Sequence, residues 1–258
     1  MKIREYASVI EQKEIATGIF SLWLQTEQIA KTAKPGQFVS VYSQDESRML
    51  PRPISICEAE PDGRLRLVYR VAGQGTEEFS RLRAGETLEI LGPLGNGYPN
   101  ELFGADILLL GGGIGIPPML QLARVLRSQA NTEVQIVAGY RDELFLTEEL
   151  AAVGKLSIAT EDGSAGTKGN VLDAVREQGI TADVICACGP KPMLRAVKTY
   201  AEERNIPCWL SLEERMACGV GACLACVCQS TEIDSHSHVH NKRVCKDGPV
   251  FRSTEVEL

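Results

Sequence analysis

The stretch ILLLGGGIGIPP, residues 107–118, carries the clearest structural signal in the chain. Its apolar run, Ile107–Leu110, indicates a buried strand, and four glycines lead from it into a helical pattern. A glycine loop between strand and helix lets a nucleotide lie close to the backbone and to the helix N-terminus. The stretch departs from the G-x-G-x-x-G fingerprint, because Ile116 and Pro118 stand where glycine would be required. A tight turn that packs the helix on the sheet therefore remains an alternative to nucleotide binding at Gly111, Gly112, Gly113 and Gly115.

The rhythm of strand, turn and helix continues from this stretch to about residue 212. Apolar strands that alternate with amphipathic helices predict an α/β domain with a parallel sheet and crossover helices over residues 100–212. The strand candidates are Ile107–Leu110, Val134–Ala138, Leu156–Ala159, Val184–Cys188 and Cys208–Ser211. The helix candidates are Pro117–Ser128, Thr147–Val153, Val171–Glu177 and Pro190–Arg204.

On the N-terminal side, short β-rich segments separated by turn residues predict a small antiparallel barrel over residues 1–99. The segment Gly92–Pro99 contains three glycines and two prolines, and is expected to break regular structure and to join the two domains. The strand candidates of the barrel are Phe38–Tyr42, Ile54–Cys57, Leu65–Tyr69 and Leu88–Leu91.

The C-terminal segment, residues 213–258, is rich in cysteine and glycine and has little apolar periodicity, so we expect a small third domain held by something other than a side-chain core. Cys218, Cys223 and Cys226 read C-x4-C-x2-C, and Cys245 follows later. This is the spacing of a plant-type [2Fe–2S] ligand set. Gly219 and Gly221 let the loop bend sharply and aim N–H groups at sulfur.

Two alternatives to this ligand set stay open. Structural zinc normally needs two distant C-x2-C pairs, and only Cys223 and Cys226 form one here. Cys228 could replace Cys226, although Cys226 preserves the x2 spacing. The run of His236, His238 and His240 lies in a polar stretch and is expected to form an exposed hairpin tip.

Composition limits the classes of function. The chain has 258 residues and a net charge of -7, which argues against a nucleic-acid-binding surface. No apolar stretch is long enough to span a membrane, and the charged N-terminus does not resemble a signal peptide. We therefore expect a cytoplasmic protein without membrane contact. The chain has nine cysteines, five of them between residues 218 and 245, and clustered thiols in a reducing compartment indicate metal or redox chemistry rather than disulfides.

A second constellation lies in the predicted barrel. Flavin dinucleotide binding requires cations and hydroxyl groups for the pyrophosphate, and strand backbone or an aromatic face for the ring. The first requirement could be met by Arg52, Ser55, Arg70 and Thr76, and the second by Ile54, Val68 and Tyr69. Gly75 would let backbone N–H groups approach phosphate at a helix that begins near Glu77. Cys188, Gly189 and Pro190 end a later strand, where open α/β sheets bind ligands.

Taken in order, the barrel, RPIS (52–55), GQGT (73–76), GGGIGIPP (111–118), CGP (188–190) and the cysteine pattern resemble the ferredoxin–NADP reductase superfamily with an appended iron–sulfur domain. The runs LEERMACGVGACLACVC (212–228), VCKDGPVF (244–251) and GPLGNG (92–97) are similar to the family of electron-transfer subunits of dihydroorotate dehydrogenase B. The resemblance covers essentially the whole chain.

The resemblance implies an oxidoreductase subunit with FAD, a [2Fe–2S] cluster and NAD as electron acceptor. Its partner would be an FMN-containing catalytic subunit, in a heterotetramer of two of each, that oxidises dihydroorotate to orotate in pyrimidine synthesis. This chain alone would not oxidise dihydroorotate. FAD would be held by Arg52, Pro53, Ile54, Ser55, Val68, Tyr69, Arg70, Gly75 and Thr76, the cluster by Cys218, Cys223, Cys226 and Cys245, and NAD by the Gly111–Gly115 loop with Cys188, Gly189 and Pro190.

The residues leave three points open. No acidic residue ends the Val134–Ala138 strand to bind a ribose hydroxyl, and Arg141 could meet a 2′-phosphate, so NAD and NADP are not separated. A related flavin and iron–sulfur reductase subunit of a hydrogenase, sulfide or ferredoxin system would share the same cofactors. A zinc-stabilised scaffold without electron transfer is the third reading, and a visible absorption spectrum would separate it from the others.

Overall fold

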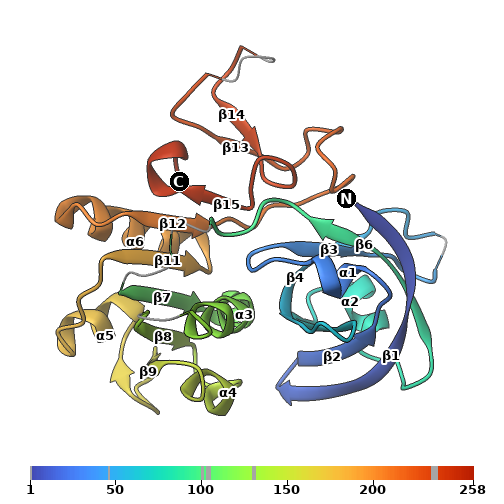
Figure 1. Ribbon diagram of the computed structural model, residues 1–258, viewed down its shortest axis with the longest axis horizontal. Coiled ribbons are helices and arrows are strands. Elements are labelled where there is room, and N and C mark those ends of the chain that lie inside the picture. Colours follow the sequence, from blue (N-terminus) through green and yellow to red (C-terminus); the bar gives the residue numbers. More distant parts are fainter. Residues whose placement is uncertain (1, 46, 100–101, 103–105, 130–131, 234–237) are drawn as a thin grey trace.

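Alternating inward apolar and outward polar residues close the N-terminal strands into a barrel (Figure 1). The computed structural model describes residues 2–45, 47–99, 102, 106–129, 132–233 and 238–258. The strand order is β1-β2-β5-β4-β3-β6, every neighbouring pair is antiparallel, and β6 returns to pair with β1. The elements are β1 (Ile3–Ala16), β2 (Ile19–Gln25), α1 (Ile29–Thr32), β3 (Phe38–Val41), β4 (Arg52–Ala59), β5 (Arg64–Arg70), α2 (Gln74–Phe79) and β6 (Thr87–Leu94).

The predicted barrel is confirmed, but the sequence analysis missed its first two strands. β1 is charged on its outer face and buries only Ala7, Val9 and Ala16 deeply, so its apolar alternation is weak. β6 runs on to Leu94, because pairing with β1 and β3 extends it into the stretch expected to be irregular. Helix α2 begins at Gln74, three residues before the expected start near Glu77.

The second half of the chain forms a seven-stranded sheet with helices on its faces (Figure 1). The predicted strands and helices are all present, and the short strand β10 is an addition. The strand order is β10-β9-β8-β7-β11-β12-β15, and all pairs are parallel except β12–β15. The elements are β7 (Ile107–Gly112), η2 (Gly113–Gly115), α3 (Ile116–Arg127), β8 (Val134–Tyr140), α4 (Thr147–Ala151), β9 (Lys155–Thr160), β10 (Thr167–Lys168), α5 (Val171–Glu177), β11 (Val184–Cys188), α6 (Lys191–Arg204) and β12 (Cys208–Ser211).

The cysteine-rich segment is less independent than its composition indicated. Strand β15 (Val250–Arg252) extends the central sheet beside β12, and η3 (Ser253–Glu255) follows it. Val244, Phe251 and Val256 are buried in one apolar cluster with residues of the α/β domain. As expected, the described part of this segment has no separate apolar core, and its buried side chains pack into the core of the α/β domain instead. The remaining strands, β13 (Val227–Gln229) and β14 (Asn241–Arg243), form the projecting hairpin of Figure 1.

A buried ion-pair network joins the barrel to the α/β domain. Glu58 of β4 has only 3% of its side chain exposed and contacts two guanidinium groups, one from each domain. Its Oε1 lies 2.6 Å from Arg66 Nη1, and its Oε2 lies 2.8 Å from Arg124 Nη2 on α3. Arg66 also reaches Glu149 of α4 at 3.4 Å, and its Nε donates to Ser21 Oγ at 2.8 Å. These contacts fix the two domains relative to one another.

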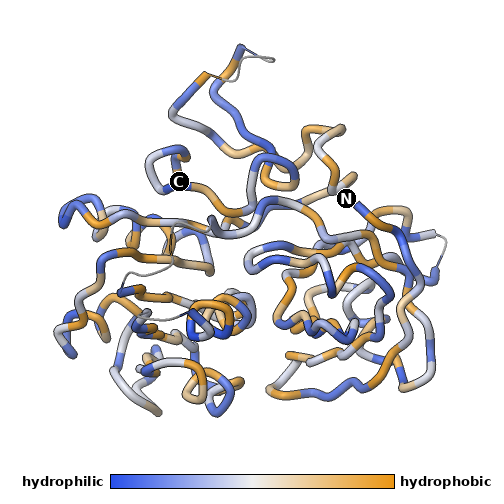
Figure 2. Tube along the Cα trace, viewed as in Figure 1, coloured by the Kyte–Doolittle hydropathy of each residue, from blue (hydrophilic) through white to orange (hydrophobic). Residues whose placement is uncertain are grey.

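Hydrophobic residues are concentrated along the strands of the barrel and of the central sheet (Figure 2). Among the described residues, no helix is long and apolar enough to cross a membrane.

Candidate functional site

The loop before α2 is built around Arg52 and Gly75. Gly75 is buried, and a Cβ there would overlap the guanidinium Nε of Arg52. The Thr76 hydroxyl accepts the N–H groups of Ala72 (2.9 Å) and Gly73 (3.2 Å), which folds the loop tightly. The structure thus brings Arg52, Gly75 and Thr76 together from two separate segments, as binding of a pyrophosphate requires.

The other predicted flavin residues lie on two different faces of β4 and β5. Pro53, Ser55, Val68 and Arg70 alternate with the inward side chains and so point away from the barrel core. Val68 is nevertheless buried, because it packs in an apolar cluster with residues of the α/β domain. Ile54 and Tyr69 belong to the barrel core, so only their backbone can serve a ligand outside it.

The ring of Tyr69 is unavailable as an aromatic platform. It stacks on Phe20 with 6.0 Å between centroids, and its hydroxyl donates to Gln12 Oε1 at 2.9 Å. Burial raises its pKa far above the ordinary value for tyrosine. The sequence allowed Tyr69 to contact a flavin ring either with its aromatic face or with its backbone. Only the backbone is available in the structure.

The glycine loop lies at the point where the strand order of the sheet reverses. From β7 the chain moves outward to β8 and β9, and then crosses to β11 on the other side of β7. In such sheets ligands bind at the carboxyl ends of the two strands that flank this switch. Here those ends are Gly111–Gly112 and Cys188–Gly189, with Cys188 opposite Gly111 in the register.

Close backbone packing explains why this loop needs glycine. A Cβ on Gly115 would overlap the carbonyl oxygen of Cys188, and one on Gly112 would overlap Met193 Sδ. The Gly111–Gly115 loop and Cys188–Pro190 are therefore one continuous surface, although Gly115 and Cys188 lie far apart in the chain. Burial raises the pKa of the Cys188 thiol to about 12, so it is a neutral thiol at physiological pH.

The flavin-side face and the glycine loop meet at Arg70. Its Nη2 lies 3.9 Å from the position that a Cβ on Gly113 would take. A ligand on the outer face of β4 and β5 would therefore adjoin one in the Gly111–Gly115 loop. After the end of β8, Asp142 accepts the N–H of Glu143 (2.7 Å) and Arg141 is exposed.

The loop that starts at Cys218 surrounds its first sulfur with N–H donors. Cys218 Sγ accepts from the backbone of Val220 (3.5 Å), Ala222 (3.3 Å) and Cys223 (3.4 Å). Gly219 (φ 66°) and Gly221 (φ 88°) provide the left-handed backbone that turns these groups inward. Burial opposes ionisation of Cys218, but the backbone donors outweigh it and lower its pKa to about 6.

Of the other three predicted ligands, Cys223 is exposed, whereas Cys226 and Cys245 form a buried pair. Cys226 Sγ accepts the N–H of Cys245 at 3.4 Å, and both residues are buried. Burial, followed by the neighbouring Cys226, raises the pKa of Cys245 to about 12. Bound iron would deprotonate such thiols outright, so this donor set fits an iron–sulfur centre. Among the described residues, no three His, Cys, Asp or Glu side chains are arranged to hold a single metal ion.

Cys228 and the histidines occupy different positions from these four. Cys228 is buried in β13 opposite Lys242, and burial raises its pKa to about 11. Within the described chain it shares no hydrogen bond with the other four. His238 and His240 are exposed in the connection between β13 and β14, as predicted, and His236 lies outside the described residues.

The cysteine loop packs against the barrel one strand away from the predicted flavin strand. A Cβ on Gly219 would lie 2.8 Å from Ser40 Oγ and 3.3 Å from Leu94 Cδ1. Ser40 of β3 is the direct register partner of Pro53 in β4, and paired strands lie about 4.8 Å apart. The sequence contains no short-range signal for this contact, because Gly219 and Ser40 lie far apart in the chain.

Comparison with known families follows the same three parts. Residues 7–98 match an oxidoreductase FAD-binding domain, and residues 109–199 match an oxidoreductase NAD-binding domain. Residues 213–257 match the iron–sulfur cluster binding domain of dihydroorotate dehydrogenase B.

Whole-chain relatives agree with these matches. The chain is 43% identical over 261 residues to the dihydroorotate dehydrogenase B (NAD(+)) electron transfer subunit of Geobacillus kaustophilus, covering 99% of each chain. It is 44% identical over 255 residues to the subunit of that name from Listeria monocytogenes, covering 97% of each. Among solved structures, an NADH-dependent reduced ferredoxin–NADP oxidoreductase, studied for flavin-based electron bifurcation, has a TM-score of 0.87 and 31% identity over 97% of this chain and 89% of that one.

Proposed function

This chain belongs to the family of electron-transfer subunits of dihydroorotate dehydrogenase B, and from that membership we propose that it carries electrons from the FMN of a catalytic partner subunit to NAD+. The partner would oxidise dihydroorotate to orotate, in de novo pyrimidine biosynthesis. One observation supports this route above the others. The cysteine loop adjoins β3 beside the flavin strand β4, and Arg70 of β5 adjoins the glycine loop. The candidate sites for cluster, flavin and nicotinamide therefore follow one another in space in the order that the route requires.

The proposal assigns each cofactor to its own part of the chain. Residues 1–99 would form the FAD domain, 100–212 the NAD domain and 213–258 the cluster domain, with β15 shared between the last two. The predicted boundary after residue 99 adjoins residues 100–101, which lie outside the described part of the chain. We propose the following assignments: for FAD, Arg52, Pro53, Ser55, Val68, Arg70, Gly75 and Thr76 with the backbone of Ile54 and Tyr69; for NAD, Gly111, Gly112, Gly113, Gly115, Cys188, Gly189 and Pro190; and for the cluster, Cys218, Cys223, Cys226 and Cys245.

The residues of the chain bind and orient, and none is needed as an acid, base or nucleophile. Bound FAD would exchange electrons singly with an iron–sulfur centre and in pairs with nicotinamide. Arg52 and the Thr76 loop would hold its pyrophosphate, while the outer face of β4 and β5 would support its ring. The neutral thiol of Cys188 offers a small apolar contact at the end of β11. The N–H groups around Cys218 would stabilise negative charge on an iron–sulfur centre.

The proposal can be tested with the purified chain carrying its cofactors. We expect NADH to reduce an artificial dye, and dihydroorotate to remain unoxidised until the catalytic subunit is added. Oxidation of dihydroorotate by this chain alone would overturn the division of labour. The native complex should contain FMN in its partner and two copies of each subunit. Purification instead with a ferredoxin-linked partner that lacks FMN would support the related reductase function.

A Gly75→Ala substitution should weaken FAD binding while leaving the barrel folded. The new Cβ would displace the Arg52 guanidinium, and a flexible side chain can move at little cost in stability. We expect the dissociation constant for FAD to rise roughly tenfold, in line with one charged hydrogen-bond partner. Flavin fluorescence titration of the deflavinated protein measures it. Gly73→Ala is the matched control, because a Cβ there meets no atom within 4 Å. Equal flavin affinities in the two variants would contradict the assignment of Arg52.

A further inference from the structure

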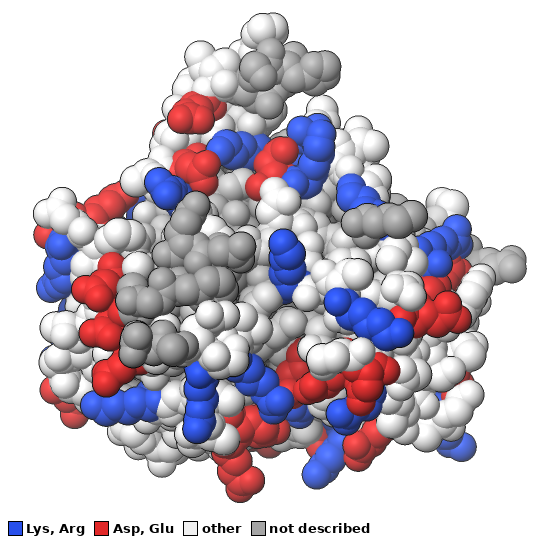
Figure 3. Space-filling model, in the orientation of Figure 1, with Lys and Arg blue, Asp and Glu red and all other residues white. Residues whose placement is uncertain are grey.

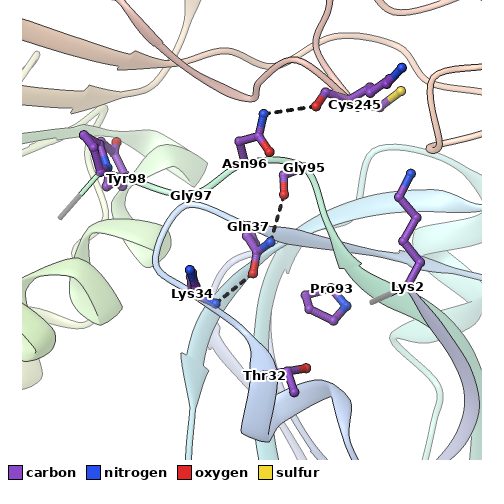
Figure 4. A pocket seen from close by; sticks show the side chains of 12 residues that line it. Lys2, Thr32, Lys34, Gln37, Pro93, Gly95, Asn96, Gly97, Tyr98 and Cys245 are labelled. Atoms are coloured by element: carbon purple, nitrogen blue, oxygen red, sulfur yellow. Dashed lines mark hydrogen bonds between the residues drawn. The ribbon is translucent and has the colours of Figure 1, made fainter.

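A basic cavity lies beside the cysteine loop and contains none of the residues assigned to FAD or NAD. It has a volume of about 720 Å³ and is formed by the end of α1, the start of β3, the end of β6 and the loop after Cys245 (Figure 4). Lys2, Lys34 and Lys246 line it from three separate segments of the chain. Cys245, one of the proposed cluster ligands, lines it as well.

None of the three lysines forms an ion pair within the described part of the chain, although the charge of Lys246 helps to lower the pKa of Asp247. The lysines that form ion pairs there are Lys191, Lys198 and Lys242. Asp247 follows Lys246 in the chain but pairs with Arg243, with Nε and Oδ2 3.1 Å apart.

Among the uncharged polar side chains of the cavity, the Tyr98 hydroxyl is buried away from solvent without a partner among the described residues, whereas Asn96 and Gln37 already have partners. Asn96 Nδ2 donates to the carbonyl groups of Lys246 and Asp247, at 3.1 and 3.0 Å. Gln37 donates to Gly95 O and accepts the N–H of Lys34, both at 2.8 Å (Figure 4). The ammonium groups are therefore the groups that this cavity offers to a ligand.

This concentration of positive charge is unusual for the molecule. The chain has a net charge of -7, and acidic side chains lie over the lower part, the edges and the upper part of the face in Figure 3, with Lys and Arg side chains between them. An uncompensated basic cavity on an acidic protein attracts and orients acidic ligands.

Two of the lysines also contact the cysteine loop from the cavity side. Lys2 Nζ donates to Val220 O at 3.3 Å. The aliphatic stem of Lys246 covers Gly221, where a Cβ would lie 2.6 Å from Lys246 Cδ. Whatever occupies the cavity is thus held directly against the loop that carries the cluster ligands.

We propose that this cavity receives acidic side chains of the catalytic partner subunit and so docks that subunit against the cluster, an inference that rests on the proposed function. The chemistry of the lining favours a protein surface over a small anion. Flexible lysines around a wide cavity act as point charges that steer association, whereas small-anion sites use fixed backbone N–H groups or bidentate arginine. Docking here would bring the partner's electron donor to Cys245.

The test compares two triple variants in reconstitution with the FMN-containing catalytic subunit. Lys2→Gln, Lys34→Gln and Lys246→Gln are combined in one protein, and Lys13→Gln, Lys155→Gln and Lys168→Gln in the control, which removes equal charge from exposed positions outside the cavity. Association rates are measured by stopped flow at 20 to 300 mM salt, about the range over which screening of surface charges changes most. We expect the cavity variant to associate about tenfold more slowly at low salt, with a flatter salt dependence, and the control to match wild type.

Further readouts separate this inference from the proposed function. Both triple variants should keep the flavin and iron–sulfur spectrum and wild-type NADH–dye activity. Because Lys2 and Lys246 both touch the cysteine loop, the single variant Lys34→Glu, which leaves that loop intact, should also slow association. Equal association of cavity variant and control would overturn the docking site and leave the proposed function standing. The docking site would also be overturned if the cavity variant associates normally but, unlike the wild type, is no longer stabilised against heat by inorganic pyrophosphate. That result would identify a small-anion site. Failure of the wild-type chain to bind the catalytic subunit would overturn both.

Discussion

A Cys226→Ser variant is expected to lack iron–sulfur absorption and to lose nearly all electron transfer between the catalytic subunit and NAD+. The Cys226 sulfur lies in a buried pair with Cys245, whose N–H it accepts at 3.4 Å. Serine is a poor ligand for iron, and removal of one of four ligands leaves the centre incompletely bound. FAD should stay bound, because its proposed residues lie on β4, β5 and the loop before α2. NADH–dye activity is therefore retained. Visible spectra and iron content, followed by turnover of the reconstituted complex, measure the two losses.

Cys228→Ser is the matched control for this experiment. It makes the same chemical change two residues further along the chain, at a thiol that faces Lys242 in the hairpin. We expect a normal spectrum and normal turnover from it. A reversed result, with the cluster lost from Cys228→Ser and kept in Cys226→Ser, would show that the ligand set includes Cys228. A colourless wild-type protein with stoichiometric zinc would remove the electron-transfer role altogether.

A Glu58→Gln variant should lose about 3 kcal/mol of unfolding free energy, because the buried Arg66 guanidinium then keeps only the more distant Glu149 carboxylate, at 3.4 Å. The melting temperature should fall by roughly 10 °C. The same carboxylate joins the barrel to α3 through Arg124. Its loss should therefore also slow hydride exchange between NADH and FAD, which requires the two domains in register. Thermal unfolding and stopped-flow flavin reduction measure the two effects.

Glu60→Gln is the control for the network. Glu60 contacts the same Arg124 at 3.6 Å, but its side chain is 30% exposed. An exposed pair of this kind contributes at most about 1 kcal/mol, so little change is expected. Equal melting temperatures for Glu58→Gln and Glu60→Gln would contradict the structural importance of the buried network. If the Glu58→Gln variant is destabilised but reduces its flavin at the normal rate, Glu58 contributes to stability alone.

Local patterns were sufficient for most of the architecture. The apolar run before Gly111 and the four further apolar runs that follow it indicated the strands of the α/β domain, because a buried strand needs a short continuous apolar stretch. β1 escaped detection because its outer face is charged along most of its length, which hides the few inward residues. Strand β15 escaped because three residues carry too little pattern, and only the edge of β12 makes them a strand.

For the candidate site, the spacing of Cys218, Cys223 and Cys226 was enough to predict a ligand set, since three thiolates on one tight loop are a local property of the chain. The sequence alone likewise predicted that the backbone at Gly75 and in the Gly111–Gly115 loop approaches a ligand closely. Only the tertiary structure could place Gly219 on Ser40, Arg70 beside Gly113 and Glu58 between Arg66 and Arg124. It also gathered Lys2, Lys34 and Lys246 around one cavity. Periodicity reports which face of an element is buried, but contacts between distant segments depend on how barrel, sheet and tail pack, and that packing has no local signature.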